Sequence, residues 1–311
     1  MPAVDDTLAS NDYAEFGLLH ENAAEWRLPF DQPSVARHSF ELAGGQALSY
    51  IRWGVDEPEL VFLHGGGQNA HTWDTVLLAL GRPAVAVDLP GHGRSDRRAD
   101  RDYGPWRNAD AVAELLSAVT PNARVVVGMS LGGATATRLA ATHPELCRRA
   151  VIVDVTPQIN DPTRAMSTLE RGSVALLAGP PIYSSFEEMA QAAISLSPLR
   201  AASGVRRGVR HNAVRLEDGS WTWRYDLFGP RPEGSRSWVD FTPLWDDVSA
   251  ITVPTLFVRG GESRYVRDED IDQMQRRLPS MQLVIVEGAG HAVQSDRPLE
   301  LVRLIREFAL T

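Results

Sequence analysis

The sequence contains no lysine, and all 31 of its basic residues are arginine. This absence excludes enzymes that form a lysine Schiff base with a substrate or with pyridoxal phosphate, and it excludes the lysine of a phosphate-binding P-loop. Cys147 is the only cysteine, so the chain has no intramolecular disulfide and no cysteine-based metal cluster. No apolar run reaches the roughly 18 residues that suggest a membrane span.

Length and charge narrow the class of protein further. The 311 residues suit one large α/β domain, with or without an inserted subdomain, and the net charge of −9 argues against nucleic acid as a partner. The first residues, 1–6, lack the basic and then apolar layout of a signal peptide. We therefore expect a cytoplasmic protein with a small-molecule substrate, no cofactor, no metal and no membrane partner, and a homodimer is possible.

Short apolar strands alternate with helical stretches along most of the chain. Parallel strands that are apolar on both faces need helices on both sides, so this order predicts an α/β fold with a mostly parallel sheet. A hairpin is expected at 37–42 and 46–53. The expected strands are 60–63, 84–87, 125–127, 150–153, 255–259 and 282–286, and the expected helices are 108–119, 131–143, 269–278 and 299–310.

The alternation is interrupted once, which divides the chain into three expected parts. Residues 1–35 form a helical N-terminal extension, 36–157 and 250–311 form the core, and 158–249 form a mainly helical cap insertion. Within the insertion, helical runs are expected at 163–177 and 185–196. The insertion also contains several large apolar side chains, which we expect to line an apolar substrate pocket. About half of them could instead form the insertion's own core. They are Met166, Met189, Trp221, Trp223, Tyr225, Phe228, Trp238, Phe241 and Trp245.

A Gly-x-Ser-x-Gly motif stands between an expected strand and an expected helix. Three valines lead into it at 125–127, and Ser130 is its central residue between Gly128 and Gly132. A strand that reverses into a helix within so few residues needs glycines beside the turn, and it leaves the central side chain projecting. A serine there lies beside a helix N-terminus, where the free N–H groups favour negative charge.

Three further motifs follow other expected strands. They are the glycine turn His64–Gly67, the segment Asp88–Asp96 and the late Gly288–His291. Together with the serine motif, and in this order along the chain, they resemble the α/β-hydrolase family. The resemblance covers residues 36–157 and 250–311.

The resemblance implies a role for each motif. Ser130 is the expected nucleophile, and His291 is the expected base that takes its proton and later protonates the leaving group. The backbone N–H groups of Gly66 and Leu131 are the expected oxyanion hole. His64 is expected to be structural, with hydrogen bonds across the base of the turn.

The third member of the expected triad departs from the family pattern. The family's usual acid follows the strand at 255–259, where this sequence has Ser263. A serine cannot carry the charge that stabilises an imidazolium. Two residues could replace it: Asp154, at the end of the strand 150–153, and Glu262, one position from the usual slot. We favour Asp154, and Asp268 is the third choice because it is better placed to cap a helix.

A serine nucleophile excludes the relatives of this family that attack through an aspartate. The sequence therefore predicts a metal-free serine hydrolase that cleaves an ester or lactone of an apolar or aromatic small molecule through an acyl-enzyme. One alternative is a carbon–carbon hydrolase of ring-cleavage products. The other is a catalytically silent relative that binds a small molecule. This alternative depends on position 263, where a serine stands in place of the family's usual acid.

Overall fold

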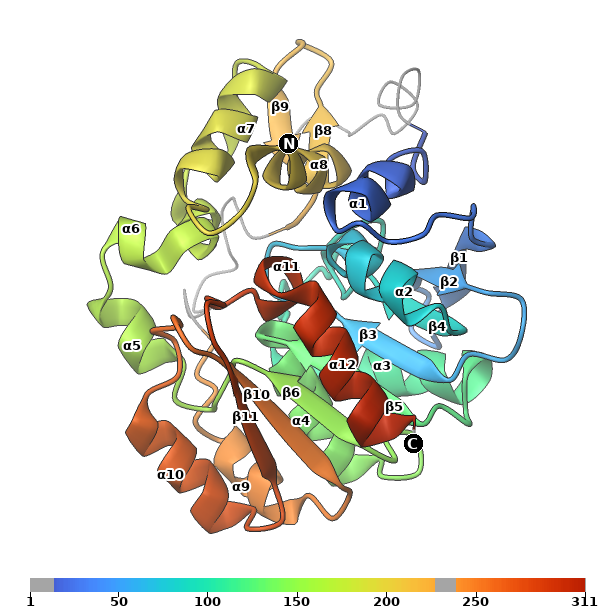
Figure 1. Ribbon diagram of the computed structural model, residues 1–311, viewed down its shortest axis with the longest axis vertical. Helices are drawn as coiled ribbons and strands as arrows, with labels where there is room; N and C mark the ends of the chain where they lie inside the picture. Colours follow the sequence, from blue (N-terminus) through green and yellow to red (C-terminus); the bar gives the residue numbers. More distant parts are fainter. Residues whose placement is uncertain (1–13, 227–238, 311) are drawn as a thin grey trace.

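The computed structural model describes residues 14–226 and 239–310, and a sheet of eight strands lies at the centre of this part of the chain (Figure 1). The second strand is antiparallel to both of its neighbours and all other pairings are parallel, so the expected mostly parallel α/β sheet is confirmed. In their order across the sheet, the strands are β1 (Val35–Glu41), β2 (Ala47–Trp53), β4 (Ala84–Val87), β3 (Leu60–Leu63), β5 (Val125–Met129), β6 (Ala150–Val153), β10 (Thr255–Gly260) and β11 (Gln282–Val286).

Helices cover both faces of the central sheet, because successive side chains of its buried strands point to opposite sides. In β3, Val61 and Leu63 belong to one hydrophobic cluster, and Leu60 and Phe62 belong to the other. The first cluster is covered by α3 (Pro105–Val119), α4 (Leu131–Thr142), α9 (Leu244–Ala250) and α10 (Asp268–Arg277). The second is covered by α1 (Leu19–Glu25), η1 (Ala70–Trp73), α2 (Asp74–Leu80), α11 (Val293–Asp296) and α12 (Pro298–Ala309).

The elements between β6 and α9 form a cap, most of which lies at one end of the central sheet (Figure 1). Three short strands pair antiparallel in the order β7-β9-β8, and they share a small hydrophobic core with α7 and α8. The cap consists of α5 (Asn160–Ala165), α6 (Thr168–Arg171), η2 (Gly172–Ala178), β7 (Ile182–Tyr183), α7 (Phe186–Ser195), α8 (Ala202–Asn212), β8 (Ala213–Arg215) and β9 (Trp221–Trp223).

The cap differs from the sequence-based expectation in its local structure. The expected helix at 163–177 is broken into three short helices, and the small sheet was not anticipated. In addition, α9 begins inside the expected range 158–249 but contributes Leu244, Trp245 and Val248 to the main core. None of the helices that the structure describes has the length and apolar character needed to cross a bilayer.

Ion pairs fasten the N-terminal extension to the core. Glu15 accepts hydrogen bonds from Arg37 Nε at 2.5 Å and from His71 Nε2 at 3.1 Å. On its other side, His71 Nδ1 lies 2.9 Å from Asp74 Oδ2. The His211 ring stacks on His71 with 3.8 Å between the ring centres. Residues 1–13 of the expected extension lie outside the described residues.

The same contacts shift the pKa values of Glu15 and His71 in opposite directions. Burial alone would lower the pKa of His71, but the charge of Asp74 and the hydrogen bonds to Asp74 and Glu15 outweigh burial and raise this pKa to about 9. Burial alone would raise the pKa of Glu15, but its hydrogen bond with His71 and the charge of Arg37 lower this pKa to about 2. His71 is therefore an imidazolium at neutral pH, held between two carboxylates.

The raised pKa of His71 predicts a pH-dependent stability. The contribution of the charged His71 to the free energy of unfolding is complete below the ordinary pKa of 6.5 and is lost as the pH rises through about 9. The free energy of unfolding, measured with urea, should therefore decrease between these two pH values. The decrease should be smaller in Glu15→Gln, because the folded-state pKa of His71 is less raised without that carboxylate. An equal decrease in the two proteins would contradict this account.

Candidate active site

Ser130, the expected nucleophile, lies at the turn between β5 and α4, as the sequence predicts. Its backbone has φ 50° and ψ −117°, a strained conformation for a residue with a side chain. A Cβ added at Gly128 would lie 2.1 Å from the carbonyl oxygen of Gly132, and one added at Gly132 would lie 2.2 Å from that of Leu63. These backbone approaches explain why both positions need glycine.

His291 lies on the loop after β11 and contacts Ser130. Its Nε2 is 3.1 Å from Ser130 Oγ, and its Nδ1 is 2.8 Å from Asp154 Oδ2. The ring of Tyr265 stacks on the imidazole with 4.0 Å between the ring centres and 27° between the planes. Only 9% of the His291 side chain is exposed. The imidazole is thus fixed between a hydroxyl and a carboxylate.

Asp154 directly follows β6, and its side chain has no exposure to solvent. It has a φ of 52°, which is uncommon for a residue other than glycine. Its Oδ1 accepts a hydrogen bond from the Gly260 N–H at 2.9 Å, and its Oδ2 accepts one from Ser263 Oγ at 2.5 Å in addition to the contact with His291. The carboxylate is therefore hydrogen-bonded on both oxygens.

The other two candidate acids lie elsewhere. Glu262 donates its backbone N–H to the carbonyl of Ala289 at 2.8 Å, and its side chain makes no hydrogen bond or ion pair with His291 in the described structure. Asp268 pairs with Arg259 at 2.5 Å on the surface. Of the three acids, the structure brings only Asp154 to His291.

The glycine turn after β3 passes beside Ser130. A Cβ added at Gly65 would lie 3.3 Å from Ser130 Cβ. His64 fixes the base of this turn, because its Nδ1–H donates to the carbonyl of Gly65 at 2.8 Å and its Nε2 accepts from the Leu89 N–H at 2.9 Å. Burial and the neighbouring His92 lower the pKa of His64 to about 3, so it is neutral and structural.

The two residues expected to donate to the oxyanion, Gly66 and Leu131, lie near Ser130. Gly66 follows Gly65 in the turn beside the serine, and Leu131 is the first residue of α4, directly after Ser130. Neither backbone N–H donates a hydrogen bond to an acceptor in the part of the chain that the structure describes. Both remain available to an oxygen of a bound substrate.

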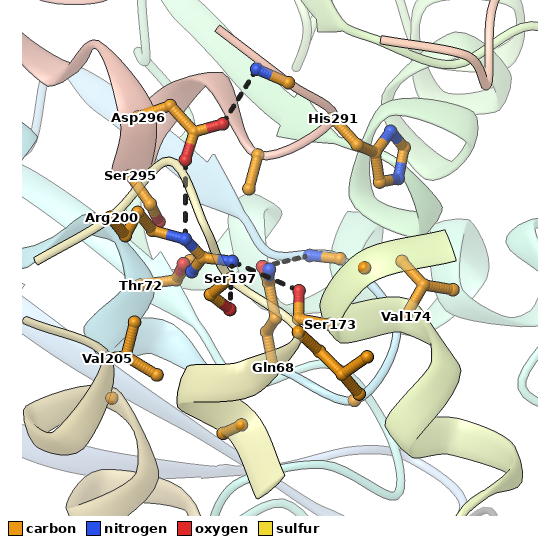
Figure 2. Close-up of a pocket in the computed structure, with 18 of the residues that line it drawn as sticks. Gln68, Thr72, Ser173, Val174, Ser197, Arg200, Val205, His291, Ser295 and Asp296 are labelled. Carbon is orange, nitrogen blue, oxygen red and sulfur yellow. Dashed lines mark hydrogen bonds and ion pairs between the residues drawn. The ribbon is translucent and has the colours of Figure 1, made fainter. Parts of the chain in front are cut away.

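A cavity of about 330 Å³ reaches Ser130 and His291 from the cap side. Figure 2 shows part of its wall, in which residues of the core such as Gln68 and Thr72 face residues of the cap such as Ser173 and Val174. Apolar side chains from the cap also line it: Val174, Leu176, Leu177, Leu196, Leu199, Val205, Trp223 and Tyr225.

Fewer of the large side chains of the insertion line the cavity than expected, and the alternative that part of them forms the cap's own core is confirmed. Among those that the structure describes, only Trp223 and Tyr225 line the cavity. Met189 belongs to the cap's own core, and Met166 and Trp245 belong to the main core. These three side chains are apolar because they pack in the two cores. Trp221 and Phe241 likewise pack against the cap core and the main core, and Phe228 and Trp238 lie outside the described residues.

Sequence reasoning missed two residues that hold the imidazole and its acid. Ser263 donates to Asp154, although it occupies the slot where the acid is usually found. Tyr265 stacks on His291, and its hydroxyl donates to the carbonyl of Arg171 at 2.8 Å. Their position in the sequence was the available signal. Both residues lie in the loop after β10, where the family's usual acid is found, and this loop faces the histidine.

Comparison with known proteins places the chain among hydrolases. The model of the Alpha/beta hydrolase family matches residues 60–304. The chain is 46% identical over 303 residues to esterase Rv0045c of Mycobacterium tuberculosis, with 97% of each protein covered. A crystal structure of that esterase superimposes with a TM-score of 0.83 at 44% identity, covering 95% of this chain and 98% of the other. The mouse sn-1-specific diacylglycerol lipase ABHD11 is 28% identical over 260 residues, which is 81% of this chain and 80% of that protein.

The contacts of His291 predict which acid matters. Asp154→Asn should lower kcat for p-nitrophenyl butyrate by about 10⁴-fold, because an amide cannot stabilise the imidazolium and favours the wrong tautomer. Glu262→Gln is the matched control, since it also neutralises a carboxylate beside Ser263, and its effect should be far smaller. Steady-state kinetics of the three purified proteins measures both effects. A large loss confined to Glu262→Gln would overturn the assignment.

Proposed function

Because the chain belongs to the alpha/beta hydrolase family, we propose that it is a serine esterase in which Ser130, His291 and Asp154 form the catalytic triad. One observation carries the proposal. Ser130 Oγ, the two nitrogens of His291 and the Asp154 carboxylate form a continuous chain of contacts of 3.1 and 2.8 Å at a cavity. The name of the relative at 46% identity, an esterase, supports the same activity.

The proposed reaction starts with the attack of Ser130 Oγ on the ester carbonyl carbon. His291 Nε2 takes the hydroxyl proton, and Asp154 stabilises the resulting imidazolium through Nδ1–H. The tetrahedral intermediate collapses when His291 donates this proton to the departing alkoxide, which leaves an acyl group on Ser130. Water, deprotonated by His291, then releases the acid and restores the serine.

The oxyanion of both tetrahedral intermediates is assigned to the backbone N–H groups of Gly66 and Leu131. The available N–H of each residue and the position of the glycine turn beside Ser130 support this assignment. Donors that are fixed before the reaction stabilise the developing charge without reorganisation, and the loss of one such donor typically costs about 3 kcal/mol.

We propose an ester or lactone with an apolar arm as the substrate. The apolar side chains that the cap contributes to the cavity support this choice. The alternative of a catalytically silent receptor depended on the absence of an acid at position 263. The contact between Asp154 and His291 supports a hydrolase instead, because the acid function has another residue to carry it.

The proposed nucleophile is tested by active-site labelling. A fluorophosphonate should label the wild type, and Ser130→Ala should lose both the label and at least about 10³-fold of p-nitrophenyl butyrate turnover. Ser249→Ala is a suitable control, because Ser249 lies on α9, contacts Trp245 of its own helix and Arg277 of α10, and does not line the cavity. Failure of the folded wild type to react would argue for a silent receptor. Turnover of a coloured dienol ring-cleavage product, in place of the esters, would favour carbon–carbon hydrolysis.

A further inference from the structure

One wall of the cavity carries an arginine that the proposed reaction does not use. Arg200 lies in the loop between α7 and α8 of the cap, and 22% of its side chain is exposed. It lines the same cavity as Ser130 and His291. Figure 2 shows its guanidinium in contact with Asp296 of the core and with two serines of the cap. A guanidinium so poorly exposed to water needs partners inside the protein.

The two serine contacts leave hydrogen-bond donors available. Arg200 Nη2 donates to Ser173 Oγ at 3.2 Å and to Ser197 Oγ at 3.1 Å. Each hydroxyl oxygen accepts here, so each hydroxyl proton is available to another acceptor. Within residues 14–226 and 239–310, no acceptor takes either hydroxyl proton or a proton of Arg200 Nη1. The group thus offers several donors on one wall of the cavity.

Asp296 compensates only one side of the guanidinium. Its Oδ1 lies 3.4 Å from Arg200 Nε, and its Oδ2 accepts a hydrogen bond from the Gly290 N–H at 2.8 Å. Since the two protons of Nη2 are donated to Ser173 and Ser197, Nη1 is the guanidinium nitrogen left for a carboxylate, which the two serine hydroxyl protons can bind as well. Burial lowers the pKa of Arg200 although Asp296 opposes this effect, so a second anion would further stabilise the charged form.

An arginine that served only to fasten the cap to the core would be expected to end in close acceptors. Arg138 on α4 makes such a contact, 2.7 Å from Asp247 of α9. Arg37 does the same with Asp88 at 2.6 Å. Arg200 differs, because its contact with a carboxylate is longer and its Nη2 donates to two neutral hydroxyls on the cavity wall.

We propose that Arg200, Ser173 and Ser197 form a subsite that binds a carboxylate carried by the substrate. The inference rests on the proposed function, since the carboxylate belongs to the same ester that the proposed triad would hydrolyse. The substrate class is an ester with an apolar chain that ends in a carboxylate, as in the half-esters of dicarboxylic acids. The apolar residues of the cap would contact the chain, and the subsite would bind its end.

Two series of esters test the inference. The first contains the monomethyl esters of linear dicarboxylic acids from succinate to suberate, and the second contains acetate esters of ω-hydroxy acids, which carry the carboxylate on the alcohol. Each compound is compared with a neutral ester in which a methyl group replaces the carboxylate. At the best chain length in one of the series, kcat/KM should be about tenfold to a hundredfold higher for the charged ester, mainly through KM.

The variant Arg200→Gln/Asp296→Asn removes both charges, so neither is left buried without its partner. In this variant the ratio of kcat/KM between charged and neutral ester should fall to about one. The matched control is Arg206→Gln/Glu187→Gln, which removes an exposed ion pair of the same cap at 2.6 Å, and Arg206 and Glu187 do not line the cavity. The control should keep the wild-type ratio.

The outcomes separate the subsite from the proposed function. Hydrolysis of neutral esters with no preference for a carboxylate in either series, or a preference that survives in Arg200→Gln/Asp296→Asn, would overturn the subsite alone. If the wild type hydrolyses no ester, the proposed function fails. Calorimetric binding of the half-esters to Ser130→Ala then decides on the subsite without catalysis: binding that exceeds that of the neutral esters supports it, and equal binding overturns it.

Discussion

A carboxylate that has no access to water must find its hydrogen-bond donors inside the protein, and the site depends on how this is achieved for Asp154. The donors come from three segments: the Gly260 N–H at the end of β10, the Ser263 hydroxyl in the following loop, and His291 after β11. The hydrogen bonds of this one group therefore link the ends of β6, β10 and β11. His291 in turn can contact Ser130 only while this arrangement holds.

The sheet topology explains how Asp154, the proposed acid, can reach His291 from a different strand than in the family pattern. β6 and β10 are parallel neighbours with Val153 opposite Val258, so the residues that follow them leave the sheet side by side. A side chain at either end can reach the histidine loop. With aspartate on β6, the position after β10 needs no charge, and Ser263 there donates a hydrogen bond that a second carboxylate could not. Asp154 and Ser263, from adjacent strand ends, therefore form one connected hydrogen-bond arrangement with His291.

The parts of the fold that were predictable are those with a local cause. Runs such as 60–63 and 125–127 are short and apolar on both faces, which specifies buried parallel strands, and the glycines around Ser130 specify the tight turn. The sequence also favoured Asp154 as the partner of His291, because an aspartate at a strand end lies at the edge where sites form, and the structure brings these two side chains into contact. The cavity wall was not predictable in the same way. Met166 and Met189 pack in two different cores, whereas Trp223 and Tyr225 belong to the cap core and also line the cavity, and only tertiary structure reveals this difference.

The cap and the core contribute different properties to the site, and the ion pair between Arg200 and Asp296 connects them beside it. The core supplies every group of the proposed reaction, whereas the cap supplies most of the apolar wall and the guanidinium of Arg200. Arg200 lies beside Asp296, whose other oxygen holds the Gly290 N–H directly before His291. A displacement of the cap would therefore alter the support of the histidine loop as well as the shape of the cavity. Selection of the substrate and alignment of His291 are linked through Asp296, so the two cannot vary independently in this chain.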